Sequence, residues 1–265
     1  MSHGELYTIV TNKAAKGKKG AIVAVVAGTK AENVIEVLQK IPEKQRRKVN
    51  EITLDMAGNM ELIAKRCFRM ATRVTDRFHV QKLATEALQE MRIKYRWEAL
   101  DAENEALDAS KRNKTSFWAE VLSNGDTLKQ LLARSRYVLY KKPNNWSQDQ
   151  KERAELLFER YPDLRQAYNL SMNLSNIFEK TTDKLYGLAR LAKWHESVRQ
   201  SGFKAFNTIS RSIKHHYETI LNYFDNRSTN ASAESFNAKI KAFRSQFRGV
   251  KNIEFFLYRL SQMYA

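Results

Sequence analysis

The stretch ATRVTDRFHV, residues 71–80, marks a change from a strand pattern to a helix pattern in the sequence. Its first half is short, partly apolar and rich in β-branched residues, which favours a strand that ends at Asp76. After Phe78 the apolar residues recur three or four positions apart, as they do on one face of a helix. The stretch therefore predicts a boundary between an α/β segment and a long helical segment.

Before this boundary, strand and helix patterns alternate. The expected elements are strands at Leu6–Val10, Ala21–Ala27, Ile52–Leu54 and Ala71–Thr75, a basic hairpin loop at Lys13–Gly20, and helices at Ala31–Lys40 and Met60–Phe68. Two of these strands end in a carboxylate, Asp55 and Asp76, at the edge where open α/β sheets usually place their ligands. The fold class predicted for this part is α/β.

After the boundary, β-rich runs almost disappear until Asn226. A capping box from Ser147 to Gln150 and the turn at Tyr161–Asp163 divide this block into helices. We expect a large all-helical insertion that interrupts the α/β core. The predicted organisation is residues 1–78 for the first part of the core, 79–226 for the insertion and 227–265 for helices that complete the core.

A polar loop after Asn226 leads into an amphipathic helix with two distinct faces. The apolar face carries Phe236, Ile240, Phe243 and Phe247. The polar face follows spacings of three and four and carries Glu234, Asn237, Lys241, Arg244 and Arg248. We expect the first face to pack in the core and the second to face solvent or a ligand.

The composition narrows the class of partner. Lys and Arg outnumber Asp and Glu by 46 to 29 in 265 residues, which favours a polyanion such as nucleic acid, although a ribosomal or membrane-surface protein fits the charge alone. A single cysteine excludes disulfides within the chain and thiolate zinc sites. No apolar run reaches the ~18 to 20 residues of a membrane span, and no signal pattern opens the chain. The expected location is the cytoplasm, without a membrane partner.

Three segments together resemble the DDE transposases of the ISL-type insertion sequences. They read LDMA at residues 54–57, VTDRFHV at 74–80 and STNASAESFNAKIK at 228–241. The likeness covers nearly the whole chain, and the order of the motifs is more specific than any single one. It implies a ribonuclease-H-like fold in which three acids hold two Mg²⁺ or Mn²⁺ ions, with Asp55 as the second acid and Glu234 as the third. It also implies DNA cleavage and strand transfer by a homo-oligomer assembled on the ends of the element and on target DNA. A protein of this kind is expected in the bacterial cytoplasm, at the nucleoid.

Each acidic or histidine position also has a simpler interpretation. Asp55 alone is typical of a turn after a strand, and Glu234 alone is typical of a first helical turn, where its charge meets the helix dipole. Asp76 is either the N-cap of the following helix or a group beside the active site. His79 either contacts a phosphate or positions a water, or is a buried histidine bonded to Asp76. We assign neither Asp76 nor His79 to direct metal binding.

Two sets of cations are candidates for DNA contacts. Lys241, Arg244 and Arg248, with Asn237 near the active site, follow one helix face below Glu234 and would track a DNA backbone toward the metal ions. The second set, in the helical block, is Arg134, Arg136, Lys141 and Lys142, for which a solvated face is the alternative. The tryptophans of the block are expected mostly in its core. His195, His215 and His216 are expected at the surface.

In this family the first acid lies on the opening strand, a few residues before the segment that starts here at Ser2. We therefore expect an incomplete catalytic core that is active only when the first acid is supplied. A noncatalytic DNA-binding or inhibitory remnant of a transposase is the alternative. A basic ribosomal or RNA-binding protein is a third hypothesis, which does not account for the spacing of the acids.

Overall fold

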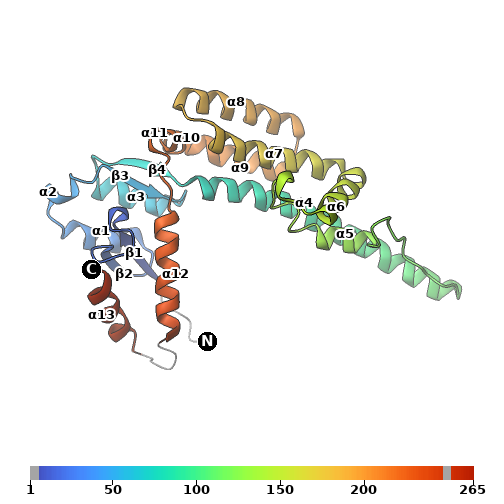
Figure 1. The fold of residues 1–265 in the computed structure, drawn as a ribbon, viewed down its shortest axis with the longest axis horizontal. Helices are drawn as coiled ribbons and strands as arrows, with labels where there is room; N and C mark the ends of the chain where they lie inside the picture. Colours follow the sequence, from blue (N-terminus) through green and yellow to red (C-terminus); the bar gives the residue numbers. More distant parts are fainter. Residues whose placement is uncertain (1–5, 247–251) are drawn as a thin grey trace. The chain divides into compact units, whose positions relative to one another are not determined.

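The computed structural model describes residues 6–246 and 252–265, so that Phe247 and Arg248 lie outside the described residues. The chain forms two compact units (Figure 1). The first unit joins the segment that ends at His79 to Glu218–Ala265, and the second is Val80–Tyr217. The first unit combines strands and helices, whereas the second is built almost entirely from helices, so the chain is a mixed α/β protein.

The first two strands form an antiparallel hairpin. Strand β1 is Tyr7–Thr11 and strand β2 is Ile22–Ala27, with Ile9 opposite Val25. The basic loop between them begins with a short 3-10 helix, η1, at Lys13–Ala15. The pairing predicted for these two strands is confirmed.

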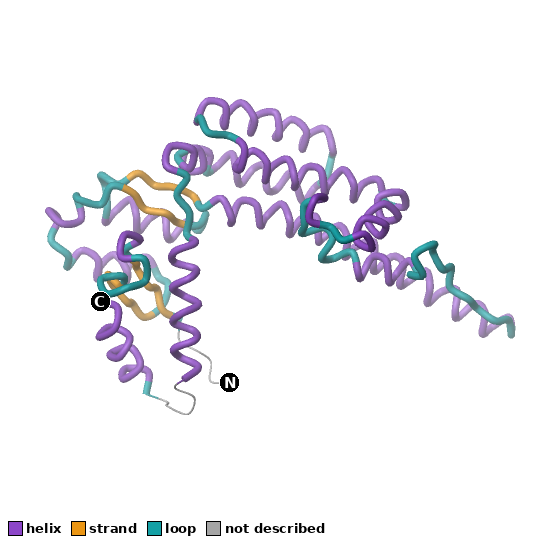
Figure 2. Tube along the Cα trace, in the orientation of Figure 1, coloured by secondary structure: helices purple, strands orange, loops and turns teal. Residues whose placement is uncertain are grey.

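The next part of the first unit alternates helices and strands. Its elements are α1 at Ala31–Gln39, α2 at Glu43–Arg46, β3 at Glu51–Leu54, α3 at Gly58–Cys67 and β4 at Thr72–Thr75. Strands β3 and β4 pair in parallel, as two strands joined by a helix can. Among the described residues β1 pairs only with β2 and β3 only with β4, which gives two separate two-stranded sheets (Figure 2).

One apolar core holds these elements together. Helix α1 contributes Val34 and Leu38, which have no exposed surface, and helix α3 contributes Ile63 and Cys67. Val26 of β2 belongs to the same cluster, and Ile52 of β3 packs against it. The two sheets therefore share one core although they do not share hydrogen bonds as strands.

The chain ends in four helices, and the last two of them form a second apolar cluster with the hairpin. They are α10 at Tyr217–Leu221, α11 at Tyr223–Asn226, α12 at Ala231–Gln246 and α13 at Ile253–Tyr264. Buried Phe236 of α12 packs with Ile22 of β2 and with Phe256 of α13, and Ile240 and Phe243 lie against this cluster. The apolar face predicted for α12 is thus confirmed at Phe236, Ile240 and Phe243.

Helix α4 at Arg77–Asn113 starts in the first unit and continues into the second. The other helices of the second unit are α5 at Leu128–Arg134, η2 at Pro143–Asn145, α6 at Gln148–Arg160, α7 at Pro162–Lys180, α8 at Lys184–Ser201 and α9 at Lys204–His215. The capping box of Ser147 and Gln150 at the start of α6 is confirmed. No described helix is both long and apolar enough to cross a membrane.

The expectation that most tryptophans lie in the core is wrong. Trp194 is buried and donates its ring N–H to the carbonyl of Leu170, whereas Trp97 and Trp118 are exposed. Trp97 lies in α4, which extends over 37 residues and has no buried residue after Arg92, and Trp118 lies in a segment without regular secondary structure. Spacing alone does not reveal which part of a long helix has a packing partner.

Candidate active site

The parallel pairing of β3 and β4 places two aspartates at neighbouring strand ends. Leu54 is the register partner of Thr75, and the backbone N–H of Asp76 donates to the carbonyl of Leu54 at 2.9 Å. Asp55 and Asp76 are the next residues on the two strands, whose backbones lie about 4.8 Å apart in such a pair. The sequence order of strand, acid, strand, acid is thus converted into proximity by the sheet.

Asp76 is fully buried, and both of its carboxylate oxygens accept backbone hydrogen bonds. Its Oδ1 accepts from the N–H of Phe78 at 3.0 Å, which caps the first turn of α4. Its Oδ2 accepts from the N–H of Asn230 at 3.0 Å, just before α12. Asp76 therefore is an N-cap and also fixes the place where the distant helix α12 begins.

Three further hydrogen bonds attach the segment before α12 to β3 and β4. The hydroxyls of Thr75 and Thr219 are 2.7 Å apart. The side-chain amide of Asn222 donates to the carbonyl of Arg73 at 2.9 Å, and that of Asn226 donates to a carboxylate oxygen of Glu51 at 3.2 Å.

These bonds place α10 and α11 with the first unit, so that it resumes at Glu218, before the expected boundary at Arg227. Sequence reasoning missed Thr219, Asn222 and Asn230 as positioning residues. The only signal that could have found them is the run of short polar side chains around a break in the helical pattern.

The same arrangement brings Glu234 to the strand ends. Ligand atoms of Asp76, His79 and Glu234 all lie within 4.8 Å of one another. Asp76 is buried, His79 is half-buried and Glu234 is exposed, so the group opens from the protein interior toward solvent. The group does not include Asp55, whose Oδ1 accepts from the N–H of Ala57 at 2.9 Å.

The structure therefore brings Glu234 together with Asp76 and His79, the two residues that sequence reasoning had not assigned to metal binding. Metal binding by Asp55 and Glu234 as a pair stays a prediction. His79 lies beside Asp76, as expected if the two residues are bonded to each other. The backbone N–H of His79 donates to the carbonyl of Asp76 at 3.2 Å.

The donor set suits a divalent cation. Carboxylate oxygens are the preferred ligands of Mg²⁺ and Mn²⁺, and an imidazole nitrogen is better accepted by Mn²⁺ than by Mg²⁺. Each oxygen of Asp76 uses one lone pair for a backbone N–H and keeps one that could face an ion. A metal between Asp76 and Glu234 would thus find two carboxylates, one of them held rigidly.

The polar face of α12 continues away from Glu234. Asn237, Lys241 and Arg244 are all exposed, and the guanidinium of Arg244 lies 5.1 Å from the centre of the Phe256 ring. Arg248, the last residue predicted for this face, lies outside the described residues. The face carries one acid at its start and cations further along, a charge order that suits a metal site followed by a phosphate backbone.

In the second set of predicted DNA contacts, several side chains already bind other groups of the protein. Arg134 forms an ion pair with the buried carboxylate of Asp126, and Lys142 forms one with Glu179. Lys141 donates to the side chain of Gln150 at 3.1 Å. The guanidinium of Arg136 lies 5.7 Å from the ring centre of its neighbour Tyr137. Within the described part of the chain, Arg136 and Lys141 thus form no ion pair that would compete with DNA.

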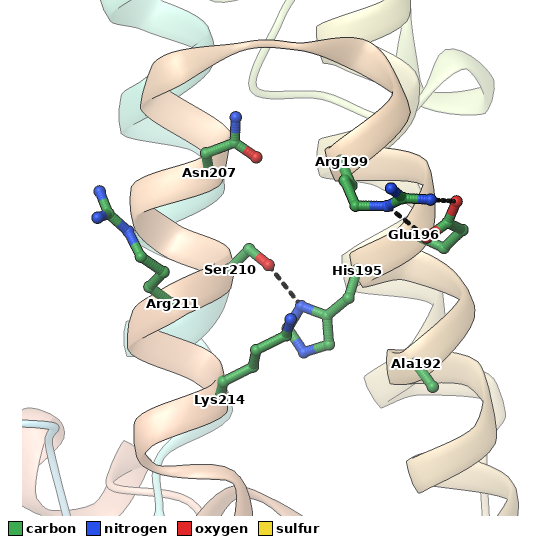
Figure 3. Close-up of a pocket in the computed structure, with 8 residues that line it drawn as sticks. All are labelled: Ala192, His195, Glu196, Arg199, Asn207, Ser210, Arg211 and Lys214. Carbon is green, nitrogen blue, oxygen red and sulfur yellow. Dashed lines mark hydrogen bonds and ion pairs between the residues drawn. The ribbon is translucent and has the colours of Figure 1, made fainter.

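The expectation that His195 is a surface group is wrong. It is half-buried on α8, and its Nδ1 lies 2.7 Å from the hydroxyl of Ser210 on α9 (Figure 3). Burial, together with the nearby charge of Lys214, lowers the pKa of His195 to about 4. The packing of α8 on α9, which the sequence did not reveal, accounts for this environment.

An acidic cluster at paired strand ends, followed by a cationic helix face, defines the first unit as a candidate metal-dependent nucleic-acid protein. Comparison with known families is more specific: the model of the ISL3-type DDE family, described as transposase, matches residues 1–260. The chain therefore belongs to this transposase family. No curated protein and no solved structure shows a significant match.

Proposed function

We propose that the first unit is the ribonuclease-H-like catalytic core of an insertion-sequence transposase, which cleaves and joins DNA strands with Mg²⁺ or Mn²⁺. The observation that carries the proposal is the placement of Glu234 beside buried Asp76, at the strand end next to Asp55. Asp76 and Glu234 lie close together although they are far apart in sequence, and Asp55 follows the strand that pairs with that of Asp76. The helices that pack on the strands of this unit are compatible with such a fold.

Each residue has a proposed role. Asp55 and Glu234 hold the metal ions, as the family resemblance implies, and the position of Asp76 within the cluster adds it as a third candidate ligand. When bound, paired divalent ions stabilise the charge on the attacking and departing oxygens of a phosphodiester. His79 positions a water or a phosphate oxygen at the half-buried side of the site. Asn237, one turn after Glu234, is placed to contact the same phosphate.

The cations further along α12 bind the DNA backbone that leads to the acids. Lys241 and Arg244 lie on the same helix as Glu234 and are exposed, so a phosphate chain along this face would reach the acidic cluster. Arg248 is proposed to extend the contact. Such contacts hold DNA without reading its sequence. Assembly of two or more copies on the element ends is part of the same proposal.

Metal binding by the purified chain tests the proposal directly. Titration with Mn²⁺, followed by electron paramagnetic resonance of the free ion, should show binding by the wild-type chain that is weakened at least tenfold in Glu234→Gln and in Asp55→Asn. The matched control is Glu254→Gln, an exposed glutamate in the first turn of α13, which should bind Mn²⁺ like wild type. Equal binding by wild type and Glu234→Gln would overturn the assignment of this site.

Variants of α12 distinguish this enzyme from the alternative, a noncatalytic DNA-binding or inhibitory protein. That protein needs the cationic face of α12 but not the acids. Weaker DNA binding in a Lys241→Gln, Arg244→Gln double variant, combined with no Mn²⁺ binding at Glu234, would favour the alternative. Mn²⁺ binding that requires Glu234 would favour the enzyme.

A further inference from the structure

The loop between β1 and β2 of the first unit is rich in lysine. Residues 13–20 read KAAKGKKG, with four lysines and no acid. Lys13 binds within the protein, because it donates to the hydroxyl of Thr53 at 2.9 Å and lies 3.6 Å from a carboxylate oxygen of Glu51. The other three lysines of the loop are exposed, namely Lys16, Lys18 and Lys19.

Backbone hydrogen bonds and one apolar contact fix the course of this loop. The N–H of Lys16 donates to the carbonyl of Lys13 at 3.1 Å, and the N–H of Lys18 donates to the carbonyl of Ala15 at 2.9 Å. Ala15 also packs against the apolar cluster of Phe236, which attaches the loop to α12. The exposed lysines therefore extend from an ordered backbone, so a ligand that binds them has little main chain to order.

Helix α12 adds a fourth cation to the loop. Gly17 has a φ of +69°, and a Cβ atom at this position would lie 3.2 Å from Nζ of Lys239. The ammonium of Lys239 thus lies against Gly17, whose neighbours in sequence are Lys16 and Lys18. Among residues 6–246 and 252–265, no carboxylate forms an ion pair with any of the four lysines that we call the hairpin-loop surface, Lys16, Lys18, Lys19 and Lys239.

The hairpin-loop surface and the acidic cluster use different sides of α12. Lys239 follows Glu234 by five positions, which at about 100° per residue places it about 140° around the helix from Glu234. Lys241 follows Glu234 by seven positions and returns to within about 20° of it. A phosphate backbone that runs along Lys241 toward the acids therefore does not run over Lys239.

The side chains of the loop suit a phosphate backbone better than a membrane. Surfaces that enter a lipid headgroup layer combine cations with large apolar side chains, whereas residues 13–20 contain no apolar side chain larger than that of alanine. Lysine binds phosphate as a compact point charge, and contacts of this kind hold DNA without reading its sequence. The expected binding is therefore independent of sequence and sensitive to salt.

We propose that the hairpin-loop surface binds the phosphate backbone of a DNA duplex, separately from the DNA that reaches the acids along α12. The choice of DNA as the polyanion rests on the function proposed above. Strand transfer joins two DNA segments, and a second cationic surface on the same unit provides a place for the segment that does not follow α12.

Chemical footprinting of lysines on the full wild-type chain tests the proposal directly. The chain is acetylated in EDTA with and without a duplex of random sequence, and mass spectrometry measures the modification of each lysine. Acetylation of the hairpin-loop surface should fall several-fold when the duplex binds. The internal control is a set of three exposed lysines of the first unit outside this surface, Lys30, Lys44 and Lys48, which should keep their reactivity. Unchanged acetylation of the hairpin-loop surface would overturn the proposal.

The salt dependence of DNA binding gives a second measurement. Each phosphate contact that is lost should lower the slope of log Kd against log salt by about one. A triple variant with glutamine at positions 16, 18 and 19 should therefore lower the slope by up to about three. The matched control has glutamine at positions 30, 44 and 48, which removes the same net charge. Equal slopes in the two triple variants would also overturn the proposal.

Two further arms test the separation from α12 and the nature of the partner. In the Lys241→Gln, Arg244→Gln variant the duplex should still protect the hairpin-loop surface, and loss of that protection would show that the two surfaces are not separate. Protection by vesicles that contain phosphatidylserine, but not by the duplex, would replace DNA by a membrane as the partner. Because all arms are measured in EDTA, failure of Mn²⁺ binding at Glu234 would not affect them.

Discussion

Asp76 and Asn230 are joined by a hydrogen bond of 3.0 Å from the backbone N–H of Asn230 to Oδ2 of Asp76, across 154 positions of sequence. The other oxygen of the same carboxylate accepts from the N–H of Phe78 at 3.0 Å. One buried side chain thus ties the end of β4 to the start of α4 and to the entry of α12. The position of Glu234 depends on this connection.

Asp76→Ala should destabilise the first unit markedly. The substitution leaves the N–H groups of Phe78 and Asn230 without their acceptor, and each such loss of a hydrogen bond to a charged group costs about 1.5 to 3 kcal/mol. We expect the free energy of unfolding in urea to fall by about 3 kcal/mol or more. Glu234→Ala, at an exposed position of the same cluster, should change it by less than about 0.5 kcal/mol. Similar losses in both variants would contradict the role given to Asp76.

Phe236→Ala should weaken both the fold and the proposed metal site. The Phe236 ring is buried in the cluster that holds α12 against β2 and α13, and truncating such a ring costs about 3 to 5 kcal/mol. Since Glu234 lies on the same helix, affinity for Mn²⁺ should fall as well. Phe255→Ala, on the more exposed side of α13, is the control. If Phe236→Ala destabilised the protein no more than Phe255→Ala, α12 would not be held by this cluster.

Asp126→Asn should destabilise the second unit by about 3 kcal/mol, because it leaves two arginines facing a buried neutral group. The side chain of Asp126 is 1% exposed and pairs with Arg153 at 3.1 Å and with Arg134. Calorimetry or urea unfolding at neutral pH measures the change. Arg134→Gln should show the same direction, whereas Arg136→Gln should not, because Arg136 is exposed and forms no ion pair with any described residue. Equal effects of the two arginine variants would contradict the structural role of Arg134.

The stabilisation by Asp126 should also depend on pH. Burial by itself raises the pKa of Asp126, but hydrogen bonds from Arg153 and Arg134 outweigh it and hold the pKa below its usual value of 3.8. A carboxyl with a lowered pKa stabilises the fold fully above its unfolded value and loses that contribution as the pH falls through the folded value. The difference in stability between wild type and Asp126→Asn should therefore be constant from neutral pH to about pH 4 and shrink below it. A difference that already shrinks at pH 6 would contradict this assignment.

His195 should make the protein less stable in mild acid. Its pKa is lowered from 6.5 to about 4 in the fold, so between these values the unfolded chain takes up a proton that the folded chain does not. Stability is thus complete above pH 6.5 and falls as the pH drops toward 4. His195→Gln should remove this component of the pH dependence, measured by urea unfolding at pH 7 and pH 5. His215→Gln, at an exposed position of α9, should leave it in place.

Local patterns predicted most of the elements correctly. The strands around Ile9 and Val25, the helix ending near Gln39 and the capping box at Ser147 all follow from side-chain periodicity and cap chemistry, which act over a few neighbouring residues. The division of the first strands into two sheets did not follow, because strand partners are chosen across the whole chain. For the same reason the burial of His195 and the exposure of Trp118 were not foreseen.

The sequence by itself determined the alternation of elements, the strong positive charge, the transposase motifs and the two faces of α12, since all of these are properties of composition and spacing. Only the tertiary structure decided that Glu234 meets Asp76 and His79 and that Arg134 is paired with a buried aspartate. Proximity between residues more than a hundred positions apart depends on hydrogen bonds such as that of Asn230 to Asp76, which no local pattern encodes.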